Sequence, residues 1–328
     1  MTVIDVHTHM LTREYLEMLV KYGAPQYQLS VNQTGEDVIL SEGAPFFTLT
    51  PAMWDYDLRV RAMDAASVDL AIVSLTCPNV YFGAAAESLA AARLVNDSMA
   101  AARTARPDRI AWLASLPWAF PALAVAELER ALGAGASGVI VIATIAGRPL
   151  EAPKFAPIWA EIDRRGLPVL VHPGPPAGAL AAGLADFGLV PAVGFPFDTS
   201  TAFARLFLDG FLDRFPGLKL IAAHGGGALP WLAGRLDRCH AAIPAARART
   251  ETPPSEYLKR IWYDAVVYAD SALALTIAAA NSNERVLYGS DFPHNIGDMP
   301  GCLTRVRALA PAAAARIAGG NARQLFNL

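Results

Sequence analysis

Two histidines separated by one residue follow a short apolar run near the start of the chain. His7 and His9 come after the segment TVIDV, whose β-branched residues predict a strand. On a strand, side chains two positions apart point to the same face, about 7 Å from each other along the chain. Two imidazoles placed in this way can converge on one divalent cation, while Thr8 points elsewhere. An isolated pair of this kind also occurs on ordinary solvated strands, so further ligands elsewhere in the chain are needed to indicate a metal site.

Three more ionisable residues end other apolar runs. His172 ends the segment LVH, His224 ends LIAAH before three glycines, and Asp291 ends LYGSD. A single histidine in such a position is usually a structural hydrogen-bonding group. Four of them with one carboxylate are a donor set suited to a zinc, manganese, iron or cobalt ion. Such an ion lowers the pKa of a bound water and polarises a neighbouring carboxylate, so we expect metal-dependent catalysis.

The segments that carry these residues belong to a repeating pattern of strands and helices. Strands are predicted at 2–6 (leading into His7 and His9), 68–75, 110–116, 138–143, 168–172, 219–224, 261–267 and 285–289. Helices are predicted at 55–66, 84–106, 121–132, 153–165, 199–214, 228–243, 269–280, 304–309 and 311–325. The strands are continuous apolar runs, which is typical of a parallel sheet covered on both faces.

This pattern predicts the α/β class and a (β/α)8 TIM barrel. A doubly wound open sheet is the alternative, but no glycine-rich phosphate loop follows the first strand. In a barrel the active site lies at the carboxyl ends of the strands, which is where the five ionisable residues fall. We predict that residues from about 11–50 form a small insertion after the first strand, with a short helix and short antiparallel strands over the barrel mouth. We expect one domain over residues 1–328.

The composition excludes several classes of protein. The 328 residues are 54% hydrophobic and 17% charged, with a formal net charge of −3, which argues against a disordered chain and a nucleic-acid partner. No run approaches the ~20 uncharged apolar residues of a membrane helix, and no secretory signal is evident. Cys77, Cys239 and Cys302 have no CxxC spacing, so we expect reduced thiols in a cytoplasmic protein.

The motifs HTH, AHGGGALPW and LYGSDFP resemble the amidohydrolase superfamily, and most closely its aminocarboxymuconate-semialdehyde decarboxylase branch. The similarity continues in WDYDLRVRAMDAASVDLAIVS and GRLDR. It implies a (β/α)8 barrel with one divalent ion, commonly zinc with manganese as an alternative, and a homodimer. Carried over by position, it implies that His7, His9, His172 and Asp291 bind the metal and that His224 is the acid/base. Spacing alone does not separate His224 from His172.

The resemblance also implies an activity. We expect a metal-dependent, non-oxidative decarboxylase of an unsaturated or aromatic carboxylic acid, with His224 and Asp291 as catalytic residues and a small-molecule acid as the partner. The alternative is a hydrolase that opens a lactone or amide on the same barrel. The segment GVIVIATIAG holds no lysine, which disfavours a carbamate-bridged binuclear hydrolase but leaves a mononuclear one open. A binding protein without catalysis is a third, weaker alternative.

Two positions depart from the pattern of this branch. Phe47 stands where the family has an arginine for a substrate carboxylate, and Ile243 stands where an arginine is donated across the dimer. Both changes remove bidentate recognition of a second carboxylate, so we expect a flatter, less charged substrate. The residues predicted to contact it are Phe47, Trp54, Phe195 and His294, although ordinary packing over the mouth would also explain the aromatic ones.

Other polar residues are expected to have structural roles. Arg59 and Arg61 lie near Asp57 and Asp64 on one helix, which predicts exposed ion pairs. Asp5 and Ser290 are expected to support the ligating histidines by hydrogen bonds.

Overall fold

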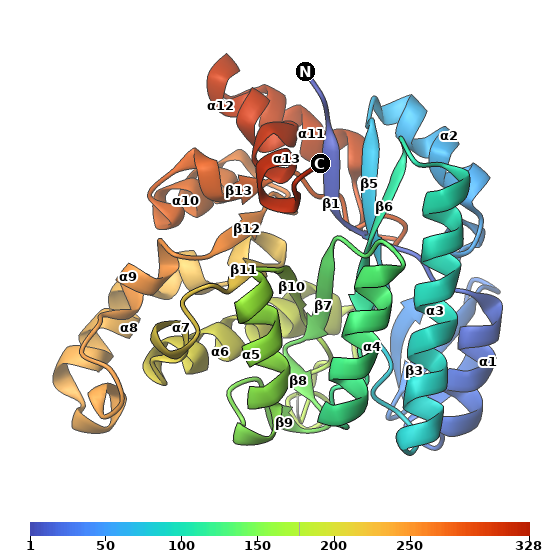
Figure 1. The fold of residues 1–328 in the computed structure, drawn as a ribbon, viewed down its shortest axis with the longest axis horizontal. Coiled ribbons are helices and arrows are strands. Elements are labelled where there is room, and N and C mark those ends of the chain that lie inside the picture. Colours follow the sequence, from blue (N-terminus) through green and yellow to red (C-terminus); the bar gives the residue numbers. More distant parts are fainter. Residues whose placement is uncertain (177) are drawn as a thin grey trace.

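A sheet of eight parallel strands forms the centre of the computed structural model, which describes residues 1–176 and 178–328 (Figure 1). In order around the sheet the strands are β1 (Ile4–His9), β5 (Leu70–Ser74), β6 (Ile110–Ser115), β7 (Gly138–Ile142), β10 (Pro168–His172), β11 (Lys219–Ala222), β12 (Trp262–Asp264) and β13 (Val286–Leu287). The segment after β13 returns to β1, since Asp291 N donates to His7 O at 2.8 Å and His9 N donates to Phe292 O at 2.7 Å. The sheet is therefore a nearly closed barrel, and the predicted (β/α)8 class is confirmed.

Helices cover the outside of the barrel. They are α2 (Tyr56–Ala66), α3 (Ala85–Ala105), α4 (Pro121–Gly133), α5 (Ala156–Arg165), α6 (Phe195–Leu208), α7 (Phe211–Arg214), α8 (Leu229–Ala242), α9 (Pro254–Leu258), α10 (Asp270–Ala280), α11 (Met299–Arg307) and α12 (Pro311–Ala315). The last helix, α13 (Asn321–Phe326), packs on the interior cluster of the barrel. The helix predicted over 199–214 was wrong in its bounds. It starts four residues earlier, and Gly210, whose φ of 64° lies in the left-handed region, separates α6 from α7.

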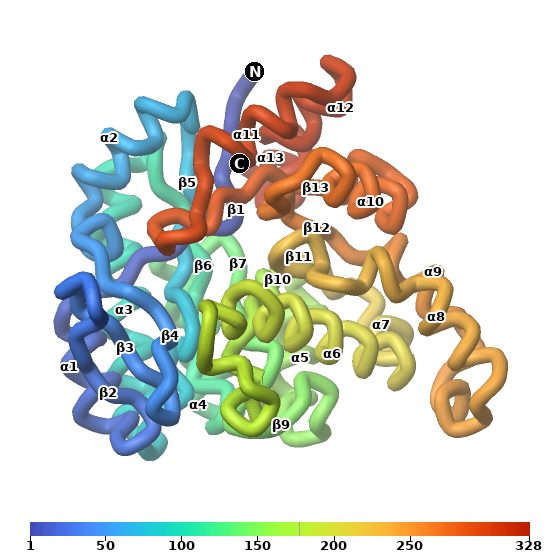
Figure 2. Tube along the Cα trace, turned by 180° about the vertical axis from the view of Figure 1, so that it is seen from behind, coloured from blue at the N-terminus to red at the C-terminus, as the bar shows by residue number. Residues whose placement is uncertain are grey.

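The barrel interior beneath the site is apolar. Its side chains come from alternate positions of the strands and from α13, namely Ile4, Val6, Ile72, Ala111, Leu113, Ile140, Leu170, Ile221, Ala223, Leu287, Ala322, Leu325 and Phe326. The last helix packs against β1, and Figure 2 shows both ends of the chain in the upper part of the molecule, with N above C. This packed layer forms a rigid base for the polar residues at the opposite ends of the strands.

Strand β1 contains an irregularity that matters for the site. Asp5 pairs with Ala71 and Thr8 pairs with Val73, so β1 holds one residue more than β5 between these two pairs. An extra residue in one strand reverses the alternation of side chains beyond it. Ile4 and Val6 therefore belong to the interior cluster, and the side chains of His7 and His9 still lie on the interior side.

The predicted insertion is present. It consists of α1 (Arg13–Tyr22) and a three-stranded antiparallel sheet of β2 (Tyr27–Val31), β3 (Asp37–Ser41) and β4 (Ala44–Thr48). Figure 2 shows this sheet beside the segment that follows β10. A short hairpin of β8 (Thr144–Ile145) and β9 (Arg148–Pro149) follows β7. Among the described helices, none is long and apolar enough to span a membrane.

Candidate active site

The five ionisable residues singled out in the sequence meet at the carboxyl ends of the strands. His7 Nε2 lies 3.1 Å from His9 Nε2 and 3.5 Å from Asp291 Oδ1, and His9 Nε2 lies 3.3 Å from the same oxygen. One donor atom from each of His7, His172, His224 and Asp291 lies within 4.8 Å of the others. Segments separated by more than 280 residues thus surround one space of atomic size.

Hydrogen bonds made by Nδ1 fix the orientation of three of these rings. The partners are Asp264 Oδ2 for His7 (2.6 Å), Ser74 Oγ for His9 (3.3 Å) and Pro173 O for His172 (2.8 Å). With Nδ1 occupied, Nε2 is the nitrogen left for the shared space. Histidines that bind metals usually donate their other N–H to a carboxylate, a carbonyl or water in this way.

Asp264, at the end of β12, is a functional residue that the sequence analysis missed. Its side chain is fully buried and accepts four hydrogen bonds. Oδ2 accepts from His7 Nδ1 at 2.6 Å and from His224 N at 2.9 Å, while Oδ1 accepts from Gly225 N at 2.9 Å and Val266 N at 3.0 Å. Burial alone would raise the pKa of Asp264, but the charge of His7 and these hydrogen bonds hold it below its usual value. One carboxylate therefore positions both His7 and the backbone of His224.

The backbone at His224 and Asp291 is unusual. Both residues have positive φ values, 56° and 59°, in the left-handed region that non-glycine residues seldom adopt. Each turns the chain as its strand ends, and His224 Nε2 comes within 3.6 Å of Asp291 Oδ2. Residues held in such conformations are concentrated at functional sites, where the surrounding structure enforces them.

The residues fit a divalent metal ion. Asp291 Oδ1 and His224 Nδ1 are buried and have no hydrogen-bond partner among the described residues, so a cation would satisfy a carboxylate oxygen that the protein leaves free. Burial lowers the pKa of His9 to about 3, and burial with the neighbouring histidines lowers that of His172. Burial would raise the pKa of Asp291, but His224 and His9 hold it well below its usual range. Neutral imidazoles and an ionised carboxylate are the protonation states that bind metals.

A cavity of ≈150 Å³ opens onto this cluster. Phe47, Phe195 and His294, which remain predicted substrate contacts, line it, and so do His172 and Asp291. His294 Nε2 lies 2.9 Å from Thr76 Oγ1, and the His294 ring centroid lies 5.2 Å from that of His9.

Trp54 is not among the residues that line this cavity. Its ring packs on the hydrophobic core, and Arg13 Cζ lies 4.8 Å from its centroid. The contact of Trp54 with substrate stays a prediction, since this residue does not line the cavity at the cluster.

The prediction for Arg59 was wrong. The side chain is fully buried, and its guanidinium donates to Thr8 Oγ1 at 2.6 Å and to His9 O. Its Cζ also lies 4.9 Å from the centroid of Phe292. The expected helix partners, Asp57 and Asp64, pair instead with Arg106 at 2.5 Å and Arg109 at 2.7 Å.

The buried pair of Asp5 and Ser290 supports the site through the backbone. Ser290 Oγ donates to Asp5 Oδ2 at 2.5 Å, and Asp5 Oδ1 accepts from His7 N at 3.2 Å. Burial raises the pKa of Asp5 to about 7. Asp5 thus bonds the backbone N–H of His7, whereas Asp264 bonds the imidazole ring of His7.

Comparison with known proteins decides the family. A family model described as Amidohydrolase matches residues 4–328. The chain belongs to the amidohydrolase family. The resemblance carried by HTH, AHGGGALPW and LYGSDFP is confirmed. In this amidohydrolase the four histidines of HTH, LVH and AHGGGALPW and the aspartate of LYGSDFP lie in one cluster.

Named relatives of this amidohydrolase are decarboxylases. A 2-amino-3-carboxymuconate-6-semialdehyde decarboxylase from Dictyostelium discoideum is 28% identical, over 99% of this chain and 91% of the relative. A 6-methylsalicylic acid decarboxylase from Aspergillus aculeatus is 29% identical, over 98% of this chain and 95% of the relative. The crystal structure of 5-carboxyvanillate decarboxylase from Sphingomonas paucimobilis has a TM-score of 0.86 and 25% identity, over 100% of this chain and 99% of that one. The expectation that the chain is an enzyme of the decarboxylase branch is confirmed.

Proposed function

We propose that this amidohydrolase is a metal-dependent, non-oxidative decarboxylase of an aromatic or unsaturated carboxylic acid. One observation carries the proposal: four histidines and Asp291 share one space, with an aromatic-lined cavity directly against them. The named relatives, two of which carry aromatic acids in their names, support the same class of reaction.

His7, His9, His172 and Asp291 are the proposed metal ligands. The lowered pKa values of His9, His172 and Asp291 favour neutral imidazoles and an ionised carboxylate, which suit a divalent ion. Burial would lower the pKa of His7, but Asp264 and Asp291 raise it, so metal binding there would displace a proton. The partners of His7, His9 and His172 at Nδ1 leave Nε2 available. A divalent ion held there would supply positive charge that polarises the oxygen atoms of the substrate. This ligand set leaves His224 free for proton transfer.

His224 is the proposed acid/base. It lies beside Asp291, with His224 Nε2 3.6 Å from Asp291 Oδ2, and its fixed backbone holds the ring at the edge of the cluster. An imidazole there can give a proton to the substrate carbon that bears the carboxylate. The C–C bond then breaks, its electron pair returns to the conjugated system, CO2 leaves, and a hydrogen remains on that carbon. Carbon and electrons balance without an oxidant or a reductant.

The cavity walls position the substrate. Phe47 and Phe195 present apolar faces, and His294, fixed by Thr76, provides a polar group on the same wall. A flat, conjugated acid fits between the aromatic rings, whereas no described side chain lining this cavity is a lysine or arginine that would bind a second carboxylate.

His224→Asn tests the assignment. We expect CO2 release from hydroxylated benzoic acids to fall by at least about 100-fold, since positioned acid/base groups contribute 10²–10⁴-fold, while the metal content stays at the wild-type value. His240→Asn is the control, because His240 lies on α8 and bonds Thr250 O, away from the cluster. Loss of metal in His224→Asn would show that His224 is a ligand. Turnover that opens a lactone or amide without CO2 loss would favour the hydrolase.

Three finer features belong to the proposal. The donor set suits zinc, with manganese as the alternative, and elemental analysis of freshly purified protein distinguishes them. We also propose a cytoplasmic homodimer that folds as one domain over residues 1–328. Light scattering after size-exclusion chromatography tests the dimer.

A further inference from the structure

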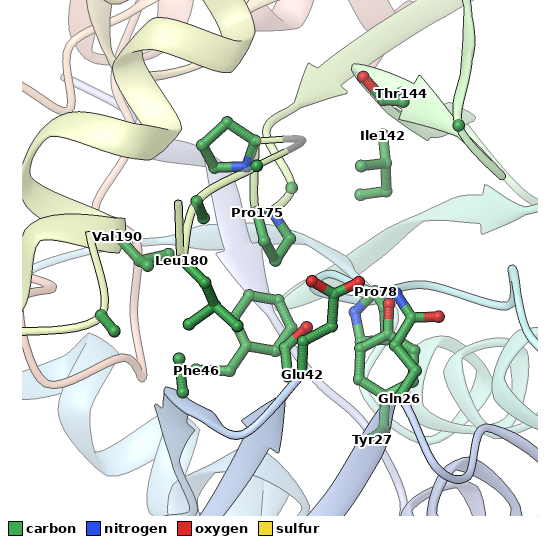
Figure 3. Close-up of a pocket in the computed structure, with 18 of the residues that line it drawn as sticks. Gln26, Tyr27, Glu42, Phe46, Pro78, Ile142, Thr144, Pro175, Leu180 and Val190 are labelled. Carbon is green, nitrogen blue, oxygen red and sulfur yellow. The ribbon is translucent and has the colours of Figure 1, made fainter. Parts of the chain in front are cut away.

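A second, larger cavity lies between the insertion and the barrel. Its volume is ≈310 Å³, and its walls come from β2 to β4, from the loop after β5, from β7 and β8, and from the segment after β10. Figure 3 shows Gln26 and Glu42 on the insertion side, Ile142 and Thr144 on the facing side, and Leu180 and Val190 on a third side. We call this space the outer cavity and the ≈150 Å³ space at the metal cluster the inner cavity.

The two cavities meet at one side chain. Phe46 lines both of them, and it lies in a row of rings that leads from the cluster outward. The His294 and Phe47 centroids are 6.0 Å apart, those of Phe47 and Phe46 are 5.3 Å apart, and those of Phe46 and Tyr27 are 6.4 Å apart. These rings form a row of aromatic side chains from the metal cluster to the wall of the outer cavity, along which a flat molecule can pack.

The sizes of the cavities favour an extended substrate. Small-molecule sites usually measure about 300–1,000 Å³, so the inner cavity is small for such a site. The inner and outer cavities together fall within this range. The inner cavity is large enough for a compact conjugated acid, and the outer cavity then remains for a substituent at its far end.

Among the described residues that line the outer cavity, one side chain is acidic and none is basic. Glu42 points its carboxylate towards the middle of the space in Figure 3, and no lysine, arginine or histidine is among the described residues that line it. A second carboxylate, Asp198, lies directly behind the wall, where it accepts from Gly174 N at 2.8 Å and from Thr144 Oγ1 at 3.3 Å. This environment favours a positive or hydrogen-bond-donating group and repels a carboxylate.

We propose that the outer cavity binds the distal end of the substrate, and that this end carries an amine or another hydrogen-bond donor instead of a second carboxylate. The reactive acid lies at the metal cluster, the conjugated part follows the rings of Phe47 and Phe46, and the distal donor reaches Glu42. The inference rests on the proposed function for the identity of the reacting end. It adds a substrate class, a mono-acid extended by a donor group.

Three 2-hydroxybenzoic acids test this arrangement. Each carries a different group on the ring carbon para to the carboxyl group: methyl, 2-aminoethyl or 2-carboxyethyl. Dissociation constants come from calorimetry, and CO2 release is measured separately. Glu42 is exposed, so we expect the aminoethyl compound to bind about two- to fivefold more tightly than the methyl compound, and the carboxyethyl compound more weakly than either. Glu42→Gln should remove this order and Glu42→Lys should reverse it. Glu36→Gln is the matched control, because Glu36 is an exposed acid of the same insertion that bonds only Asn32 and Thr34.

The outcomes separate the two proposals. Equal affinities in the wild-type protein, no measurable binding of any of the three, or an order unchanged by Glu42→Lys would overturn the outer-cavity assignment. The predicted order of affinities without CO2 release from any compound would support the outer cavity and refute the decarboxylase function.

Discussion

Replacing Asp264 by asparagine tests whether one buried carboxylate organises the metal site. The two oxygens of Asp264 face four donors: His7 Nδ1 and His224 N at Oδ2, and Gly225 N and Val266 N at Oδ1. An asparagine side chain keeps only one oxygen, so its NH2 group must face two of these donors. Two buried hydrogen bonds are lost whichever way the amide turns, unless the His7 ring changes its tautomer.

Both orientations of the amide have a calculable cost. With the oxygen towards His7, the N–H groups of Gly225 and Val266 are left without acceptors, at about 1–3 kcal/mol each. With the NH2 towards His7, Nδ1 must accept and the proton moves to Nε2, which removes the proposed ligand atom. We therefore expect the metal-free Asp264→Asn protein to lose about 2–6 kcal/mol of unfolding free energy. Its metal affinity should fall by about 10–100-fold, or about 1.4–2.7 kcal/mol.

Two measurements check this prediction. Urea unfolding of the chelator-treated protein gives the stability, and competition with a chromophoric chelator gives the zinc affinity. Asp108→Asn, at an exposed aspartate, is the control for the loss of one charge. If Asp264→Asn unfolds at the wild-type urea concentration and binds zinc within twofold of wild type, Asp264 does not set the orientation of His7.

Three further perturbations have defined outcomes. Arg59→Met removes the buried donor to Thr8 Oγ1 and His9 O, and urea unfolding should show a loss of about 3 kcal/mol, with Arg59→Lys in between; an unchanged midpoint would refute the contact. Burial raises the pKa of the Asp198 carboxyl from 3.8 to about 6, so the folded state binds the carboxyl proton more tightly than the unfolded state does. The protonated carboxyl therefore stabilises the folded state at low pH, and this contribution is lost as the pH rises through about 6. Relative to Asp198→Asn, the wild-type protein should lose about 2 kcal/mol between pH 4.5 and 6.5, and parallel curves would contradict the shift. Removing a metal present at 100 times its dissociation constant should lower the unfolding free energy by about 2.7 kcal/mol, which re-addition restores; an unfolding curve that does not respond to chelation would exclude a bound ion.

The proposed metal ligands could be found from the sequence because their position depends on topology. In a parallel barrel every strand ends at the same rim, so His7, His172 and Asp291 converge even if the predicted strand bounds are off by a few residues. The predicted strands at 261–267 and 285–289 were in fact too long, since β12 is Trp262–Asp264 and β13 is Val286–Leu287. The error had no effect on Asp291, which follows its strand in either case.

The same error concealed Asp264. The predicted strand 261–267 placed this residue in the middle, where it would be packed among neighbours and not at the rim. β12 ends at Asp264, whose carboxylate accepts from Gly225 N and Val266 N, and the first of these contacts joins residues 39 positions apart. No local sequence pattern reports such a contact.

Arg59 shows the opposite error. Its neighbours Asp57 and Asp64 favoured local ion pairs, and local pairing on a helix is the commoner outcome. The arginine instead reaches Thr8 and His9, some 50 residues earlier in the chain, with its guanidinium fully buried. Whether Arg59 forms local ion pairs or the buried contact depends on which face of α2 packs on the barrel, and tertiary structure sets that face.

The extra residue between Asp5 and Thr8 divides β1 into a part that packs in the barrel interior and a part that carries the histidines of the site. Below it, Ile4 and Val6 fill the barrel floor; above it, His7 and His9 take the same side although their positions have the opposite parity. Shortening β1 by that one residue would restore a regular ladder with β5 and turn both imidazoles towards the surrounding helices. A family member with a gap at this point would lose two of the four proposed metal ligands.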